Sequence, residues 1–395
     1  MAKKPISQRK ILILSDGKPG HFNQSLGIAD RLPDMSIEVV QLRYKKKWRD
    51  NLIRILARLL GGLKSKEHTP SPLSRGEQPP LSPFYKGKLM DSRLRGNDMK
   101  MTFRERVIVS LLKWGLDETS SKALFDAGEY DLILSTGSSV AAPNLLMSRL
   151  MDAKAVVCTR PSPLGISYFD LAILPEHSRP RKIPKNVLMT FGVPNRITPK
   201  SVAETGAELS QMLSLSEKPV IGVLLGGDDP YYRIPPDLAY GLCDALLDID
   251  AQIALTSSRR TVAETDRALK LRLEGHPSCC HLVIANEVSP PNTVSGILGI
   301  SDVVIVTEDS FSMVCEAGSS GKKVVILNVE RKGKGNPKRE RVYKMLVEQG
   351  FVKRADVSGL RDLITGLLGD DEKVKFLDDA QVAGDGIRKL FLVAD

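Results

Sequence analysis

The stretch KILILSDGKPGH, residues 10–21, decides the fold of the N-terminal half. Its run ILIL is continuously apolar, which is typical of a strand buried on both faces of a parallel sheet. Residues 16–21 hold two glycines and a proline and predict a tight loop, and residues 23–32 then show the apolar spacing of a helix. Strand, glycine-rich loop and helix form the opening unit of a doubly wound α/β fold.

Short apolar runs continue along the chain and alternate with helical patterns. They predict strands at residues 36–41, 130–135, 156–158, 171–174 and 187–190. The pattern restarts with PVIGVLLGG at 219–227, followed by strands at 253–256, 281–285, 302–307 and 323–327. Such alternation predicts parallel sheets covered by helices on both faces. The fold class is therefore α/β, with two Rossmann-like domains facing a cleft.

Length and composition agree with two domains. A chain of 395 residues is too long for one ordinary core, and 42% hydrophobic with 26% charged residues is the balance of a globular protein. The expected parts are an N-terminal domain at 1–195, a linker at 196–218, a C-terminal domain at 219–370 and a C-terminal helix at 371–395. Residues 64–100 are rich in proline and lack periodicity, so we expect a disordered insertion there.

The net charge of +10 comes from one region, because residues 45–113 hold 17 Lys or Arg against 6 Asp or Glu. A local positive field attracts phosphate groups. No nucleic-acid motif accompanies it, so we expect no nucleic-acid partner.

Just before the insertion, one predicted helix has an apolar face. That face holds Leu52, Ile55, Leu56, Leu59, Leu60 and Leu63. Arginines lie elsewhere on this helix, Trp48 stands at its start, and residues 103–114 repeat the mixture. Such a helix can pack on the N-terminal sheet or lie in a membrane interface, and the sequence leaves both open.

The five cysteines show no C-x-x-C spacing, and their odd number argues against a disulfide framework. The start of the chain lacks the apolar core of a signal peptide, and no stretch reaches the roughly 18–20 apolar residues of a spanning helix. We therefore expect a cytoplasmic protein, peripheral to the inner membrane if the basic helix lies on lipid.

Ligands of open α/β sheets bind outside the carboxyl ends of the strands, which points to three loops of the C-terminal half. Gly226 and Gly227 allow backbone N–H groups to approach an anion, or form only a tight turn. The loop Ser258-Arg259-Arg260 offers hydroxyls and two cations suited to a diphosphate, or is an ordinary helix cap.

The strongest local signal is the segment 307–316, TEDSFSMVCE. A buried strand leads there into hydroxyls and carboxylates, and Glu316 follows Ser312 by one helical turn. The alternative is a capped helix with Glu308 and Asp309 at the positive end of its dipole.

Several motifs together resemble the plant mitochondrial-fission protein family and its bacterial relatives. The resemblance rests on Asp16-Gly17-Lys18-Pro19-Gly20-His21 with Asn23-Gln24, Pro175-Glu176-His177, Asn186-Val187-Leu188, Ser258-Arg259-Arg260-Thr261 and residues 307–316. It implies a GT-B fold and sugar transfer onto an envelope glycolipid or polysaccharide, such as lipopolysaccharide. The donor is then a nucleotide sugar, used as substrate and not as cofactor.

The resemblance also implies roles for residues. The donor site would comprise Ser258, Arg259, Arg260, Thr307, Glu308, Asp309, Ser310, Ser312 and Glu316, to which the place of Gly226 and Gly227 after a strand adds these two glycines. Glu316 would hold the ribose, since a carboxylate can accept hydrogen bonds from both hydroxyls of a vicinal diol. The acceptor loop would comprise Gly17, Lys18, Gly20, Asn23 and Gln24.

Gly20-His21 also resembles a Gly-His pair in the transferase that adds N-acetylglucosamine to the lipid-linked peptidoglycan precursor. We expect His21 to act as general base on the acceptor hydroxyl and Asp16 to orient it. The histidines form no tight ligand motif, so we expect no metal. Two other functions stay open: a non-hydrolysing nucleotide-sugar epimerase, and a non-catalytic membrane or division adaptor.

Overall fold

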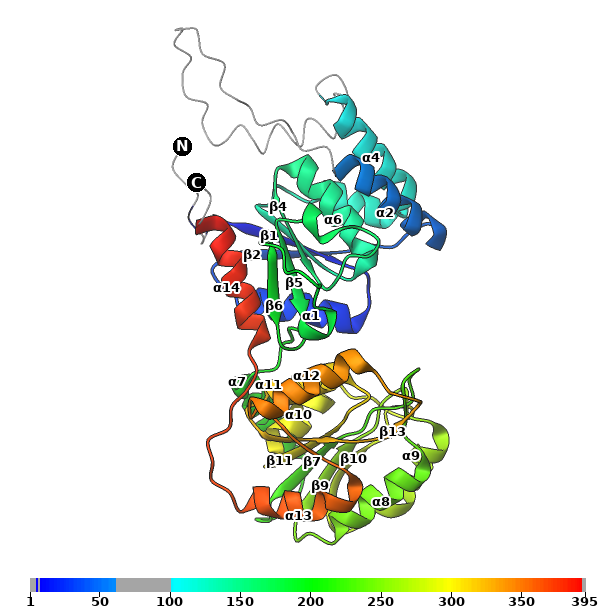
Figure 1. Cartoon of the computed structure of the whole chain (residues 1–395), viewed down its shortest axis with the longest axis vertical. Coiled ribbons are helices and arrows are strands. Elements are labelled where there is room, and N and C mark those ends of the chain that lie inside the picture. Colours follow the sequence, from blue (N-terminus) through cyan, green and yellow to red (C-terminus); the bar gives the residue numbers. More distant parts are fainter. Residues whose placement is uncertain (1–4, 6–7, 62–100, 393–395) are drawn as a thin grey trace. The chain divides into compact units, whose positions relative to one another are not determined.

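Six strands form the first sheet, in the order β2-β1-β3-β4-β5-β6 (Figure 1). The structure is a computed structural model that describes residue 5, residues 8–61 and residues 101–392. The strands are β1 (Lys10–Ser15), β2 (Ser36–Gln41), β3 (Leu132–Thr136), β4 (Lys154–Cys158), β5 (Leu171–Pro175) and β6 (Val187–Thr190). Strands β1 to β5 pair in parallel, as the sequence predicts.

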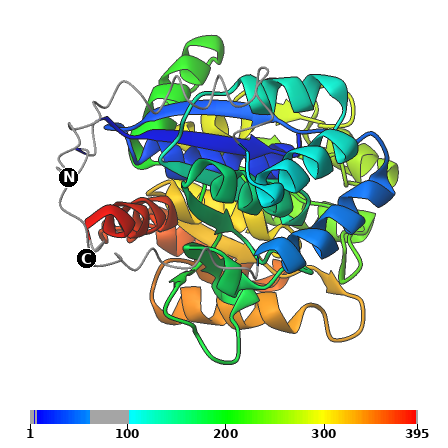
Figure 2. The same ribbon diagram turned by 90° about the horizontal axis from the view of Figure 1, so that it is seen from above.

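Helices cover both faces of this sheet. They are α1 (Pro19–Asp30), α2 (Lys47–Gly61), α4 (Phe103–Gly115), α5 (Glu118–Asp126), α6 (Ser138–Met151) and α14 (Asp379–Leu392). One core joins the sheet to α2, α4, α5 and α6, and the other joins it to α1 and α14. Figure 2 shows α14 in red on its side of the sheet. The strands are apolar on both faces because both faces are buried.

A second sheet of six parallel strands has the order β10-β9-β7-β11-β12-β14. Its strands are β7 (Val220–Leu224), β9 (Gln252–Thr256), β10 (Cys279–Val283), β11 (Val303–Thr307), β12 (Lys323–Leu327) and β14 (Lys353–Ala355). Its helices are α7 (Pro199–Met212), α8 (Pro236–Leu247), α9 (Ala263–Leu273), α10 (Thr293–Ile300), α11 (Phe311–Ser319), α12 (Pro337–Glu348) and α13 (Val357–Leu368). Helices α8, α9 and α13 cover one face, and α7, α10, α11 and α12 the other.

The chain divides into two units. The first holds Met1–Leu174, Ser178–Met189 and Ala383–Asp395, and the second holds Pro175–His177 and Thr190–Val382. The stretch 196–218, expected to link the two domains, belongs to the second unit, where Pro199–Met212 form helix α7. Val202 and Leu209 of this helix are buried in the core of the second unit. The expected insertion at 64–100 lies outside the described residues.

Helix α7 approaches α10 so closely that glycines are required at the contact. A Cβ added to Gly299 would lie 2.0 Å from the carbonyl oxygen of Val202, and one added to Gly206 would lie 2.6 Å from the backbone of Gly299. Both obstacles are backbone atoms, which cannot rotate away.

We expect Gly299→Ala to lower the free energy of unfolding by about 1–3 kcal/mol, because the added methyl group forces the two helices apart. Gly366→Ala in α13 is the control, since its Cβ would meet nothing within 4 Å. There the change should be neutral or stabilising by up to about 1 kcal/mol. Urea unfolding of both variants measures the difference, and equal midpoints would remove the close-packing argument.

Two helices differ from expectation, α1 in its first residue and α2 in the face that it buries. Helix α1 begins at Pro19 and not at Asn23, because proline favours the first helical turn, so Gly20 and His21 belong to the helix. Helix α2 forms as expected but buries a different face: Ile53 and Ala57 enter the core, while Ile55 and Leu59 of the predicted apolar face stay exposed. Among the described residues, no helix has the length and apolar character needed to cross a membrane.

Candidate functional site

In the first unit, a histidine and an aspartate meet at the carboxyl end of β1. The Nδ1 atom of His21 lies 3.0 Å from Oδ2 of Asp16. The hydroxyl of Ser139 donates to the same oxygen at 2.8 Å, and Nζ of Lys18 lies 3.0 Å from it. The structure thus brings together both residues that the sequence analysis selects for catalysis.

These contacts decide the ionisation of Asp16. Burial by itself would raise the pKa of its carboxyl, but hydrogen bonds from His21, Ser139 and Lys18 hold that pKa well below the usual range. An ionised carboxylate can only accept, so it favours the His21 tautomer whose Nδ1–H donates to it and whose Nε2 carries the free lone pair. This is the arrangement that a general base needs.

Gly137 makes room for the imidazole. It has φ +94°, and a Cβ there would lie 2.5 Å from Nδ1 and Cε1 of His21. Only glycine fits, because any side chain would meet the ring and would also be strained at this φ. The sequence analysis does not select this residue, although Gly137 follows the strand expected at residues 130–135 by two positions.

Four of the five expected acceptor-loop residues are exposed. Gly17, Lys18, Gly20 and Asn23 are exposed, whereas Gln24 turns inward, where its Oε1 accepts a weak hydrogen bond from the Cys158 thiol. Gly17 has φ +75°, which the turn after β1 requires. Gln24 therefore does not lie free for a ligand in this structure.

In the second unit, the glycine pair differs from expectation. The N–H of Gly226 donates to Oγ1 of Thr307 at 2.7 Å, and that of Gly227 donates to Oδ2 of Asp309 at 2.9 Å. These donors are already used inside the protein, so they do not form an anion site. The glycines are needed for space, because a Cβ at Gly227 would lie 2.1 Å from the backbone of Arg260.

The cations of the Ser258 loop have unequal roles. Arg260 donates to the carbonyl oxygen of Gly227 at 2.9 Å and pairs with Asp309 at 2.8 Å, so it holds two loops together. Arg259 is exposed, and the Ser258 hydroxyl accepts a hydrogen bond from the N–H of Arg260. Of the two arginines, Arg259 remains the one suited to a ligand phosphate.

Glu308 is a structural residue and not a ligand contact, which corrects the expectation. Its side chain is 0% exposed. Arg331 lies 2.8 Å from Oε2, Arg354 also pairs with Oε2 at 2.5 Å, and the N–H of Val329 donates to Oε1 at 3.1 Å. Asp309 and Thr307 are likewise buried in the network described above.

Helix α11 places Ser312 and Glu316 one turn apart, whereas Ser310 is buried. Ser310 precedes the helix, Ser312 is exposed in its first turn, and Glu316 follows by four residues and is partly buried. No hydrogen bond or ion pair engages the Glu316 carboxyl within the part of the chain that the structure describes. Burial raises its pKa to about 7. A half-buried carboxyl without a partner is suited to hydroxyl donors of a ligand.

The raised pKa of Glu316 predicts a pH effect on stability. Its pKa rises from 4.5 to about 7, so the folded protein binds this proton more tightly than the unfolded chain. Stability therefore falls as pH rises between these values, by at most about 3 kcal/mol. Glu316→Gln should match wild type near pH 4.5 and exceed it above pH 7 in denaturant titrations. Parallel pH profiles of the two proteins would contradict this account.

His177 is a site candidate that the sequence analysis used only as part of a motif. Its ring makes an edge-to-face contact with Phe311, the first residue of α11, with centroids 4.6 Å apart. Burial, together with Arg339, Lys338 and Arg341, lowers the pKa of His177 to about 4. Its buried Nδ1 has no hydrogen-bond partner among the described residues. A neutral imidazole beside α11 could only be found from the fold, since it lies over 130 residues before that helix.

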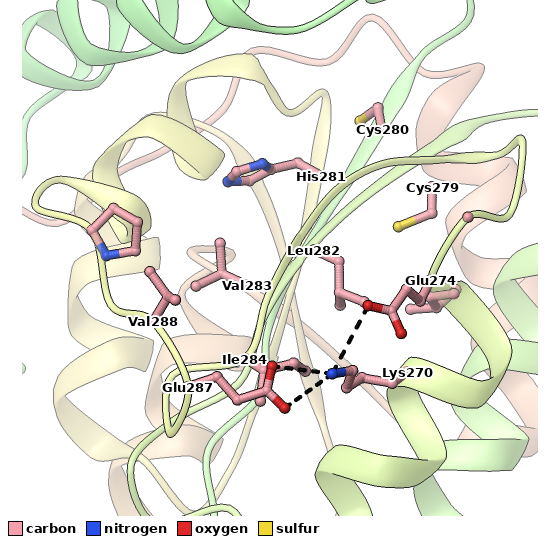
Figure 3. A pocket seen from close by; sticks show the side chains of 13 residues that line it. Lys270, Glu274, Cys279, Cys280, His281, Leu282, Val283, Ile284, Glu287 and Val288 are labelled. Atoms are coloured by element: carbon pink, nitrogen blue, oxygen red, sulfur yellow. Dashed lines mark hydrogen bonds and ion pairs between the residues drawn. The ribbon is translucent and has the colours of Figure 1, made fainter.

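A pocket of about 450 Å³ lies at the edge strand β10, away from these residues (Figure 3). Figure 3 shows Lys270 between Glu274 and Glu287, whose carboxylates lie 3.9 and 3.0 Å from its Nζ. The lining of this pocket contains none of the expected site residues. Within the described ranges, no group of three or more His, Cys, Asp or Glu side chains could hold a metal ion.

Comparisons with known proteins identify relatives. A model of the family described as mitochondrial fission ELM1 matches residues 19–391. The mitochondrial fission protein ELM1 of Arabidopsis thaliana is 29% identical over 155 residues, which cover 38% of this chain and 35% of the relative. That match spans about a third of the curated relative.

Solved structures show the same fold. A Listeria monocytogenes protein assigned as a UDP-N-acetylglucosamine 2-epimerase superposes with a TM-score of 0.50 at 13% identity, covering 97% of this chain and 95% of that one. MurG of Acinetobacter baumannii gives a TM-score of 0.43 at 13% identity, covering 98% and 99%. The two α/β units with parallel sheets confirm the GT-B fold class expected from the sequence.

Proposed function

The chain belongs to the mitochondrial fission ELM1 family, and from that premise we propose that it is a glycosyltransferase. It moves a sugar from a nucleotide-sugar donor to a membrane-associated envelope glycolipid or polysaccharide. The observation that carries the proposal is the Asp16–His21 pair, with Nδ1 held at 3.0 Å and Nε2 left as base. An adaptor has no need of an oriented imidazole.

In the proposed reaction, the acceptor hydroxyl oxygen forms a bond to C1 of the donor sugar. The bond from C1 to the phosphate oxygen breaks, and the nucleoside diphosphate leaves with the electron pair. His21 takes the acceptor proton at Nε2, and Asp16 stabilises the resulting imidazolium. The step therefore needs no oxidant or reductant.

We assign the donor to the second unit. The Glu316 carboxylate accepts hydrogen bonds from the ribose hydroxyls, and the exposed Ser312 hydroxyl donates to a phosphate oxygen. The unsatisfied N–H groups of the first turn of α11 and the guanidinium of Arg259 stabilise the charge on the leaving diphosphate. The proposal keeps the cytoplasmic, membrane-peripheral location expected from the sequence.

One alternative has support of its own. The family is described by mitochondrial fission, and the Gly226, Gly227 and Glu308 groups are used inside the protein. Both facts favour an adaptor that kept the fold without the chemistry. The epimerase alternative rests on fold similarity alone.

One assay separates the three functions. Purified protein is incubated with a panel of nucleotide sugars, with and without a lipid extract, and nucleoside diphosphate is measured. A transferase releases diphosphate only when the acceptor extract is present. An epimerase converts the donor sugar without the extract, and an adaptor does neither. Either of the last two results would overturn the proposal.

A further inference from the structure

Two helices of the first unit, α2 and α4, lie side by side (Figures 1 and 2). Both keep large apolar side chains exposed. Their inner sides enter the core. On the outer side, Trp48 is 53% exposed, Ile55 54% and Leu59 68%, and Phe103 of α4 is 77% exposed. Within the described residues, these are among the most exposed large apolar side chains, and they gather on two neighbouring helices.

The spacing shows that this surface is continuous. Trp48, Leu52, Ile55 and Leu59 stand at i, i+4, i+7 and i+11, so they form one stripe along α2. A groove on α4 is lined by Phe103, Arg106, Val107, Ser110, Leu111 and Trp114. The rings of Trp48 and Trp114 meet edge to face with centroids 5.4 Å apart and join the two stripes. We call the combined surface the α2–α4 face.

The charge around the α2–α4 face is strongly positive. Residues 45–61 and 101–115 hold nine Lys or Arg and two Asp or Glu. Both acidic groups are engaged: Asp50 pairs with Arg54 at 2.7 Å, and Glu105 accepts the N–H of Thr102 at 2.7 Å as part of a capping box. Lys46, Lys47 and Arg58 are exposed around the stripe.

We propose that the α2–α4 face binds the surface of a bilayer that contains anionic phospholipids. Trp48, Ile55, Leu59 and Phe103 enter the boundary between head groups and acyl chains, while the surrounding cations contact lipid phosphates. A second copy of the chain is disfavoured, because two identical faces would bring their positive rims together. A protein partner is also disfavoured, because protein–protein interfaces are depleted of lysine and this surface is not.

Vesicle flotation of the full chain, without nucleotide, tests this surface. Wild type should bind vesicles of phosphatidylglycerol and phosphatidylethanolamine, bind phosphatidylcholine vesicles much less, and lose binding as salt is raised. The triple variant Ile55→Gln, Leu59→Gln, Phe103→Gln should bind at least tenfold more weakly. The variant Lys46→Glu, Lys47→Glu, Arg58→Glu should lose the preference for anionic lipid.

The matched control is Met212→Gln with Leu271→Gln, which replaces exposed apolar side chains of the second unit. It should bind vesicles as wild type does, and all variants should keep the wild-type melting temperature, since every replaced side chain is exposed. Unchanged binding by the triple variant would overturn the proposal. So would a wild-type dimer that the triple variant disperses, because the occupant would then be a second copy.

Failure here is distinguishable from failure of the proposed transferase function. Lipid binding is measured without nucleotide, and nucleotide binding can be measured without lipid. A chain that binds nucleotide but no vesicle would refute only the α2–α4 face.

Discussion

Replacing His21 with alanine lowers the rate of sugar transfer by a factor of about 100 to 10,000, which is the usual contribution of a positioned general base. The loss should be in kcat, because the acceptor proton moves only in the reacting complex. Donor binding should stay unchanged, since the donor is assigned to the second unit. Diphosphate release in the presence of lipid extract measures both parameters.

Asp16→Asn sharpens this prediction. The amide keeps the shape of the side chain but can donate to Nδ1 of His21, which would favour the tautomer with the proton on Nε2. The double variant Asp16→Asn, His21→Ala should lose little more activity than His21→Ala alone, because the two residues act as one unit. Lys122→Ala, an exposed change on helix α5 of the same unit, is the control. Full activity of His21→Ala would remove the histidine from the mechanism.

Glu308→Gln lowers the free energy of unfolding by about 3–5 kcal/mol. The fully buried carboxylate holds Arg331 and Arg354, and without it their charges lose their buried partner. Glu340→Gln is the matched control, because Glu340 pairs with the same two arginines but its side chain is 40% exposed. That change should cost about 1 kcal/mol or less.

Denaturant titration of both variants at neutral pH measures these differences. A small effect of Glu308→Gln, similar to that of Glu340→Gln, would show that Glu308 is not a structural centre. It would then be available again as a ligand contact.

The sequence predicts the bounds of several strands. Strands β1, β2, β6 and β12 begin and end at the expected residues. Strand β10 spans Cys279–Val283 and not the expected 281–285, because the polar His281 interrupts the apolar run and conceals where the strand begins. Helix α1 begins four residues before the expected Asn23, because Pro19 and Gly20, which are typical of a loop, here occupy the first helical turn, where proline is favoured.

The candidate site, too, could be predicted only in part from the sequence. Asp16 and His21 are five residues apart, so the sequence could suggest their contact. The roles of Glu308 and Gly226 depend on partners 21 to 81 residues away, which no local pattern specifies. For the same reason the segment TEDS could not show which carboxylates are used inside the protein. The donor-site role of Glu316 stays a prediction.

Thermal unfolding of wild type and Glu316→Ala with UDP, GDP, CMP, dTDP and ADP tests the central claim most directly. A nucleotide at about 100 times its dissociation constant adds roughly 2.7 kcal/mol to stability. The account predicts that one nucleotide selectively raises the melting temperature of wild type and has little effect on Glu316→Ala. No shift with any nucleotide, or the same shift in both proteins, would contradict it.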